Sequence, residues 1–409
     1  MTAHRRFALL PLLPLLVLVS IITVTLMWCV LAATASAAVP GAEIWRRSYD
    51  GGGGGYDDQA ADLVFAPKGY FYVVGQVTRT ASGNANIAVA RYSQAGSRKW
   101  VRRYDGPAHE KDFASAAVCD RAGNVYVTGY IVRGVYNIDL VLIKYSPSGK
   151  RLWLRTWDSA KHGDDIGRQL ALDGAGNVYV AGTSRNDPAD LVGQDLKLLK
   201  YDRYGHRKWV RSYDPGVGMY CDANGLVVDK KRGRMFVGAV IDTPGASWQW
   251  LAARYSTSGA RRWLWLWGGL NDDQAKALAL GPDGSIYQVG NADGGGGSDS
   301  DAAIVRWTAT GVIAPGWPRI HDGVGSGNDH FYGVAVDRFG RSTRSATRIA
   351  PSAPTTPWCT ATTAPASCCG TTPTITPARR PCGRSPSTRP ATPTPAATPT
   401  RVAPTRRTS

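Results

Sequence analysis

One carboxylate recurs along this chain at a constant place relative to a turn. An aspartate stands eight residues before the same turn position in five segments, and these repeat aspartates are Asp58, Asp112, Asp165, Asp273 and Asp329. In one further segment Cys221 takes this place, with Asp222 beside it. Carboxylates gathered in a ring could bind a hard cation such as calcium. The competing interpretation is that each Asp accepts backbone N–H bonds and fixes the start of its own segment. Because the residue repeats with the segment, we favour this second role and expect no resident cofactor.

Other side chains that could bind a ligand or take part in a reaction lie where the segments differ. Residues 321–330, HDGVGSGNDH, place two His near two Asp, which suits either a metal or a polar loop. The glycine-rich runs 51–55 and 293–301 could hold a phosphate only before a helix, and no helical pattern follows them. His109 and the other histidines fall on scattered loops, and neither a Ser-His-Asp order nor a nucleophile elbow is present. We therefore predict loops here and no catalytic residue.

A tryptophan sets the period of the segments that carry these residues. Successive members of the series are 55, 53, 56, 54 and 54 residues apart, and they are Trp45, Trp100, Trp153, Trp209, Trp263 and Trp317. Most are preceded by a basic-Tyr pair and a Gly, as in KYSPSGKRLW, and most are followed by an aromatic-Asp pair. A period of about 50 residues indicates a repeat architecture rather than two or three separate domains.

Each repeat contains four short strands. An alternating run leads to an Asp-x-x-Gly turn, a Val/Tyr strand follows, and the basic-Tyr strand and the tryptophan strand complete the unit. Four-stranded units in tandem predict an all-β fold, a β-propeller in which neighbouring blades cover each other's faces. We expect the tryptophans to be largely buried between blades, with each indole N–H bonded to a backbone acceptor.

The quoted motifs resemble a known family. The pattern D-x-x-G-N-x-Y-V-x-G, followed by K-Y-x-x-x-G-x-x-x-W, is similar to the repeat of exported seven-bladed bacterial propellers, over residues 45–341. It resembles the tryptophan-docking repeats of quinoprotein dehydrogenases more distantly. The resemblance implies a propeller fold and little about activity. Two repeats depart from it, since 229–238 has an extra residue and Gly281 stands in place of Asp.

The first 37 residues have the pattern of an export signal. A basic start, an apolar run from Phe7 to about Ala33 and a small-x-small site at Ala35–Ala37 predict a cleaved signal peptide, with an uncleaved anchor as the alternative. We therefore expect the protein in the cell envelope or outside the cell, with a membrane contact only through such an anchor.

The repeat stops inside its sixth unit. From residue 342 the chain is rich in Thr, Pro, Ala, Ser and Arg and contains no Asp, Glu or Lys. A disordered stalk would have such a composition. A one-base slip after Arg341 explains more, because the alternative frame can read V-Y-A-L-G at 342–346 and restore a Trp at 370, 53 residues after Trp317. We therefore predict propeller repeats over 38–341, five full units and a truncated sixth in an open ring, and an unpacked frameshifted tail over 342–409.

This hypothesis changes the charge balance. Nine of the 48 basic residues lie in 342–409 and two in the signal, which leaves 37 against 31 acidic residues. So mild an excess gives no support to a nucleic-acid partner. Four of the seven cysteines lie in the tail and Cys29 in the signal, and we expect Cys119 and Cys221 to be buried thiols rather than a disulfide.

The sequence thus favours a non-catalytic binding or scaffolding module outside the cytoplasm. Its ligand would be a protein, a peptide or a polysaccharide, held on a loop-rich face or at the mouth of the channel. The alternative is an enzyme with a cofactor on the propeller axis, such as a quinone-dependent dehydrogenase.

Overall fold

A computed structural model describes the chain from residue 43 to residue 401 with gaps. The described ranges are 43–51, 57–78, 83–134, 137–185, 193–216, 218–243, 246–268, 272–293, 300–322, 327–349, 356–362 and 400–401. The predicted signal, most of both glycine-rich runs and the recovered position 370 lie outside them.

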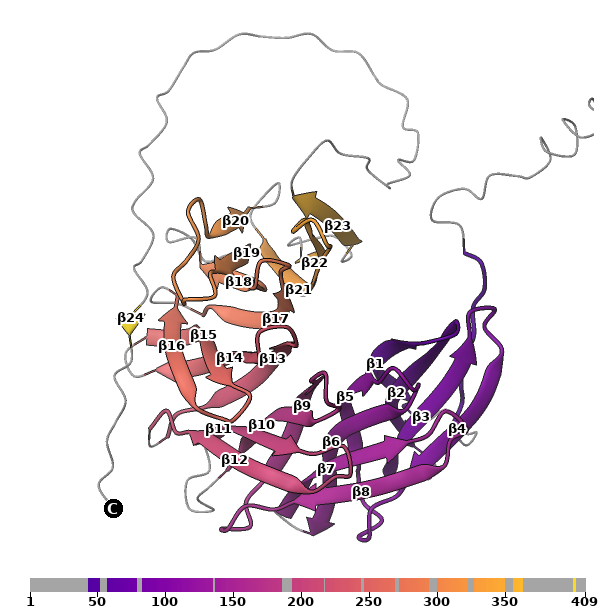
Figure 1. Ribbon diagram of the computed structural model, residues 1–409. Coiled ribbons are helices and arrows are strands. Elements are labelled where there is room, and N and C mark those ends of the chain that lie inside the picture. The colour runs from indigo at the N-terminus through magenta and orange to yellow at the C-terminus, as the bar shows by residue number, and fades with distance from the viewer. Residues whose placement is uncertain are drawn as a thin grey trace, which may run out of the picture. The chain divides into compact units, whose positions relative to one another are not determined.

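The described residues are all-β and contain no helix, as predicted. Consecutive strands form antiparallel meanders, blades A to F in chain order (Figure 1). Blade A comprises β1 (Gln59–Ala66), β2 (Tyr70–Thr78), β3 (Ala85–Ser93) and β4 (Arg98–Tyr104). Blade B comprises β5 (Phe113–Cys119), β6 (Val125–Gly134), β7 (Asn137–Tyr145) and β8 (Arg151–Trp157). Blade C comprises β9 (Asp165–Leu172), β10 (Val178–Ser184), β11 (Asp195–Tyr201) and β12 (Arg207–Tyr213).

The later blades vary the same plan. Blade D comprises β13 (Cys221–Asp229), β14 (Arg234–Thr243), β15 (Ala246–Ser256) and β16 (Arg261–Trp267). Blade E comprises β17 (Gln274–Leu280), β18 (Ile286–Asp293), β19 (Ser300–Trp307) and β20 (Arg319–His321). Blade F comprises β21 (Asn328–Val336), β22 (Ser342–Ile349) and β23 (Thr356–Thr362). A two-residue strand, β24 (Thr400–Arg401), pairs with the edge of blade D. Blade F has three strands in the described residues. Four-stranded blades in tandem, the last incomplete, make this a β-propeller architecture.

The Asp-x-x-Gly turn is built by its own side chains. In blade B, Asp120 accepts hydrogen bonds from the backbone N–H and the side-chain amide of Asn124, at 2.9 and 2.7 Å. Gly123 has a φ of 86°, a conformation that glycine adopts without steric cost. Tyr126 donates its hydroxyl to the same carboxylate at 3.2 Å, so the turn also fixes the start of the next strand.

The first strand of every blade carries an irregularity at the same place. One residue in each has no partner in the second strand, a bulge three residues after the repeat-aspartate position. Next to it, a carbonyl of the first strand approaches a glycine of the second. A Cβ on Gly129 would lie 1.8 Å from the Phe113 carbonyl oxygen, and one on Gly75 would lie 1.9 Å from that of Gln59. The glycine of the V-Y-V-x-G motif is therefore required by backbone contact.

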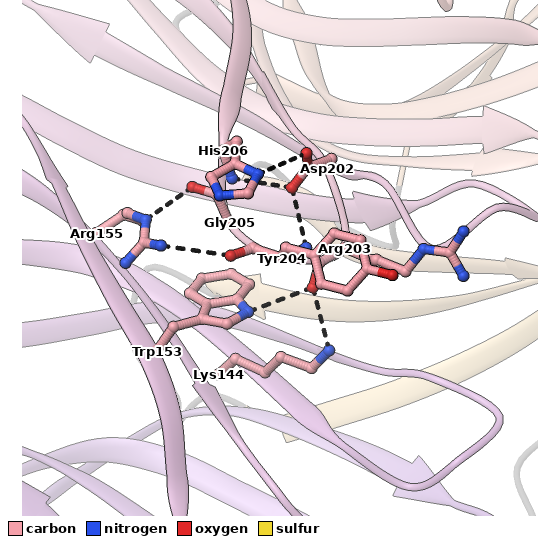
Figure 2. A network of polar contacts seen from close by, with 8 residues as sticks. All are labelled: Lys144, Trp153, Arg155, Asp202, Arg203, Tyr204, Gly205 and His206. Atoms are coloured by element: carbon pink, nitrogen blue, oxygen red, sulfur yellow. Dashed lines mark hydrogen bonds and ion pairs between the residues drawn. The ribbon is translucent and has the colours of Figure 1, made fainter.

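The repeat tryptophans lie between blades, as predicted. In Figure 2, the Trp153 indole N–H donates to the Arg203 carbonyl in the next blade at 3.3 Å, and Arg155 Nε donates to the Gly205 carbonyl at 2.7 Å. Trp100 and Arg102 repeat this pair of bonds with Pro147 and Gly149, and Trp263 bonds to Ala309. In blades A, B and C, the arginine of a Trp-x-Arg pair thus bonds to the hairpin of the next blade, whereas blade D has Trp265 in place of this arginine.

The burial of the tryptophans agrees with the expectation. Trp100, Trp153, Trp209 and Trp263 are largely but not completely buried, because each indole lies over the hairpin of the next blade at the outer strand. Trp209 Nε1 has no hydrogen-bond partner among the described residues. The largest fully buried side chains are instead Trp250 and Trp307, which lie outside the tryptophan series.

The segment around Trp45 docks as a fourth strand would. Arg47 Nε donates to the Gly96 carbonyl at 3.2 Å, the same bond that Arg102 makes one blade later. Asp58 accepts from the backbone N–H of Gly51 at 2.6 Å, which repeats a contact of the later blades. Arg47 and Gly51 therefore make inter-blade contacts of the kind that the later repeats make.

The expectation that nothing in 342–409 packs on the repeats does not hold for β22 and β23. Strand β22 pairs with β21 in the register of the other blades, and β23 continues the sheet. Backbone pairing needs no particular side chain, so the open edge of β21 accepts this sequence. One side chain of β22 fits poorly, because Arg344 is only 5% exposed and its Nε has no hydrogen-bond partner among the described residues. Burial and the charge of Arg319 lower the pKa of Arg344 to about 10.

Two smaller expectations can also be compared. Cys119 and Cys221 are both free thiols, the second fully buried and the first half-buried. Within the described ranges, no helix is long and apolar enough to cross a membrane.

Candidate functional site

The repeat aspartates hold the starts of their blades. Asp112 is fully buried and accepts from the backbone N–H of Gly106 and from that of Val132, the second at 3.2 Å. Asp165 accepts in the same way from Ser159 N–H. Asp58 and Asp273 each accept from the end of the second strand, from Thr78 N–H at 2.9 Å and from Asp293 N–H at 2.7 Å. Each carboxylate thus joins the inter-blade linker to its own blade.

Burial controls the protonation of these carboxylates. It raises the pKa of Asp112 to about 6 and that of Asp165 to about 6, against the opposing effect of their hydrogen bonds. Asp329 is also fully buried, at the start of β21. Within the described ranges, no three His, Cys, Asp or Glu side chains are grouped so that they could hold a metal ion.

The histidines lie apart from one another. His109, His162 and His206 each pair with an aspartate four residues earlier, at 2.8, 2.6 and 3.0 Å, on exposed loops. The aspartate raises the pKa of His109 and of His162 through its hydrogen bond and charge. His321 ends β20 and His330 lies on β21, and the loop between them is only partly described.

The bulged residues form a second constant position with variable chemistry. Blades A and B carry small residues there, Ala61 and Ser115. The following blades carry large polar or aromatic ones, and we call this set the bulge row: Arg168, Asn224, Lys276 and Tyr332. The first strands of consecutive blades pack against each other, so the row crosses four neighbouring strands. Bulges commonly redirect a side chain beside a binding site.

Charged contacts connect the row across the blades. Arg168 Nε lies 2.9 Å from Asp222 Oδ1 on the next first strand. Asp222 interacts electrostatically with both Arg168 and Lys276, while burial raises its pKa. Lys276 Nζ donates to the neutral side-chain oxygen of Gln274 at 2.7 Å, and burial lowers its pKa. Two cations therefore share one carboxylate, and the row keeps an excess positive charge.

Two neutral groups complete this surface. Asn224 donates its amide to the Ala275 carbonyl in the next blade, and its buried Oδ1 has no partner among the described residues. His330 is half-buried, and burial followed by the charge of Lys276 lowers its pKa. The ring of His330 lies 5.8 Å from that of Tyr332, which is 50% exposed. The surface thus offers two cations and an exposed aromatic ring, a set suited to binding.

A cavity of 320 Å³ lies between blades A and B, near the starts of their first strands, β1 and β5. Asp57 and Lys111 contribute its charged groups, and Gln59, Gln76 and Phe113 line it further. The side chains that line this cavity are chemically less varied than those of the bulge row.

The sequence singled out the repeat aspartates but missed the bulge row. A bulge adds one residue without a composition signal, so the alternating pattern alone does not reveal it. The available signal was comparison between repeats, because the position three residues after each repeat aspartate changes from Ala and Ser to Arg, Asn, Lys and Tyr.

Comparison with known proteins adds similarity of fold only. No family model matches the chain, and no curated protein matches it. Among solved structures it is similar to the β-propeller domain of the Trilobed protease from Pyrococcus furiosus, which has an open velcro topology, with 8% identity, 73% of this chain and 82% of that chain covered, and a TM-score of 0.43. It is also similar to prolyl oligopeptidase B from Galerina marginata, with 9% identity, 73% and 41% covered, and a TM-score of 0.40. The propeller assignment rests on the six sheets of the chain itself.

Proposed function

We propose that this protein is an exported, non-catalytic propeller of the seven-bladed bacterial repeat family, and that it binds its ligand on the bulge row. The row supports this proposal, because the same backbone position carries different interaction chemistry in four consecutive blades while the framework around it repeats. In repeat proteins such variation on one face is typical of a binding surface. Export rests on the signal pattern of residues 1–37.

An array of polysaccharides and peptides, probed with the purified full chain, tests this function. We expect binding to one ligand class and loss of binding when Arg168, Asn224, Lys276 and Tyr332 are all replaced by Ala. Binding that survives this fourfold change would place the site elsewhere. A matched fourfold change on the outer strands, at Arg98, Lys99, Arg151 and Leu152, controls for nonspecific effects.

The enzyme alternative has its own test. Addition of pyrroloquinoline quinone and calcium to the full chain should produce neither a spectral change nor a thermal shift. A stoichiometric spectral change would instead support a quinone-dependent dehydrogenase.

A further inference from the structure

The chemistry of the bulge row narrows the class of ligand. Its two cations, Arg168 and Lys276, lie on β9 and β17, with the carboxylate of Asp222 on the strand between them. Arg168 is paired with Asp222 at 2.9 Å, whereas the hydrogen bond of Lys276 goes to the neutral Gln274. A half-buried ammonium without its own carboxylate attracts an anionic group, since charges interact strongly in such partly desolvated places.

The neighbouring strand contributes a flat surface beside this cation. Tyr332 occupies the same bulge position on β21, next to β17, and half of its side chain is exposed. A tyrosine ring presents an apolar face with a polar edge, which suits the C–H face of a pyranose. On the other side of Lys276, Asn224 donates its amide to the Ala275 carbonyl and its amide oxygen is buried, so this residue supports the row rather than contacting a ligand.

We propose that the bulge row binds a uronic-acid saccharide, with its carboxylate at Lys276 and its ring against Tyr332. This inference rests on the proposed binding function and names its ligand class. A saccharide fits better than an acidic peptide, because the row places an exposed aromatic ring beside a cation. A neutral saccharide would leave Lys276 without an anion, and an acidic peptide would leave Tyr332 without a sugar face.

Calorimetric titration of the full chain with trigalacturonate tests the proposal. The matched probe is the fully methyl-esterified trimer, which keeps the rings and hydroxyls and lacks the charge. We expect the acid to bind at least tenfold more tightly than the ester, and its affinity to fall as salt rises. Equal binding of acid and ester would overturn the proposal and leave a saccharide-binding function intact.

Variants locate the contacts. Lys276→Met should weaken trigalacturonate binding at least tenfold, whereas Lys99→Met on the outer strand β4, which removes the same charge, should change it less than twofold. Tyr332→Phe should retain binding and Tyr332→Ala should lose it, and circular dichroism should show each variant folded. If Lys276→Met binds normally, the carboxylate lies elsewhere and the proposal fails.

An acidic peptide serves as the competing ligand. Triglutamate carries the same number of side-chain carboxylates as trigalacturonate and no sugar ring. If it binds as tightly as the saccharide and Tyr332→Ala does not affect it, the ligand class is peptide and the uronate assignment is wrong. If neither probe binds while the array identifies another ligand, the inference fails and the binding function stands.

Discussion

Two positions on each first strand, three residues apart, behave in opposite ways. The first is the repeat aspartate, buried and bonded to backbone N–H groups in blade after blade. The second is the bulged residue, small in blades A and B and chemically varied in the four that follow. The repeat aspartate stabilises its own blade, whereas the bulged residue is available to a ligand. Carboxylates in a regular series are therefore weaker evidence for a metal than their number suggests.

The largest expected effect is on the backbone geometry that both positions share. Gly129→Ala should destabilise the protein by about 3 kcal/mol or more, because its Cβ would lie 1.8 Å from the Phe113 carbonyl oxygen and the strand must move. Urea denaturation measures this loss. Gly134→Ala on the same strand is the control, since a Cβ there has no neighbour within 4 Å. Similar losses for both variants would mean that the bulge does not constrain Gly129.

The next effect separates the two positions directly. Asp112→Asn should cost about 1–3 kcal/mol, because an amide cannot accept from both Gly106 and Val132 as a carboxylate does. Ser115→Ala, at the bulge of the same strand, should change stability by less than about 0.5 kcal/mol. Equal costs would remove the distinction between a structural and a variable position.

The Asp112 variant also predicts a pH dependence. The pKa of Asp112 in the folded state, about 6, lies above the ordinary aspartate value of 3.8, so the proton is bound more tightly in the folded state. The stability that this group contributes is complete below about pH 4 and is lost as pH rises to about 6. Asp112→Asn lacks this loss, so its deficit relative to the wild type should be smaller at pH 7 than at pH 4. A deficit that grows over this range would contradict the raised pKa.

Much of the constant framework was predictable, for physical reasons. Tryptophan spacing and turn chemistry gave the repeat, its four strands and the inter-blade place of Trp153, because these depend on local patterns. The burial of the tryptophans was predictable in kind, whereas the small part of each indole that stays exposed depends on how far the neighbouring hairpin covers it. The strands beyond residue 341 were missed because sheet edges pair through the backbone, to which composition is a poor guide. The bulge row was not predictable, because a bulged residue is identified from the pairing register of two strands, and this register is not known from one strand alone.

Blade F offers a comparison with the complete blades. Its buried Arg344 occupies the register position that Val127 has in blade B. Arg344→Val should stabilise the protein by about 1–2 kcal/mol, because a buried guanidinium, whose Nε has no hydrogen-bond partner among the described residues and which lies over the Phe331 ring, is replaced by an apolar side chain. Thermal unfolding measures the gain, and Thr343→Val at the exposed neighbouring position should give little. A loss of stability in Arg344→Val would show that this strand is adapted to its arginine.

The frameshift hypothesis explains why such a residue is there. It predicts apolar residues over 342–346 in the alternative frame, where β22 lies. Resequencing the gene around codon 341 tests it. An intact sequence, with stop codons closing the alternative frame before codon 370, would make 342–409 a genuine part of this protein.

A smaller effect distinguishes two repeat tryptophans. Trp153→Phe should lose about 1 kcal/mol more than Trp209→Phe, because the Trp153 N–H bonds to the Arg203 carbonyl whereas the Trp209 N–H has no partner among the described residues. Denaturation of both variants under the same conditions gives the difference. Equal losses would show that ring packing, not the hydrogen bond, determines the contribution of this position.

The smallest expected effect concerns the bulge row itself. Lys276→Met should change the free energy of unfolding by no more than about 0.5 kcal/mol, because the lost bond to Gln274 is offset by relief of a half-buried charge. Lys99→Met provides the exposed reference. A position kept for binding should tolerate this change in the absence of ligand and lose the added thermal stability that a ligand provides. If Lys276→Met instead destabilises the free protein as much as Asp112→Asn does, the bulged position is structural too. The proposal that the bulge row is a binding surface would then be wrong.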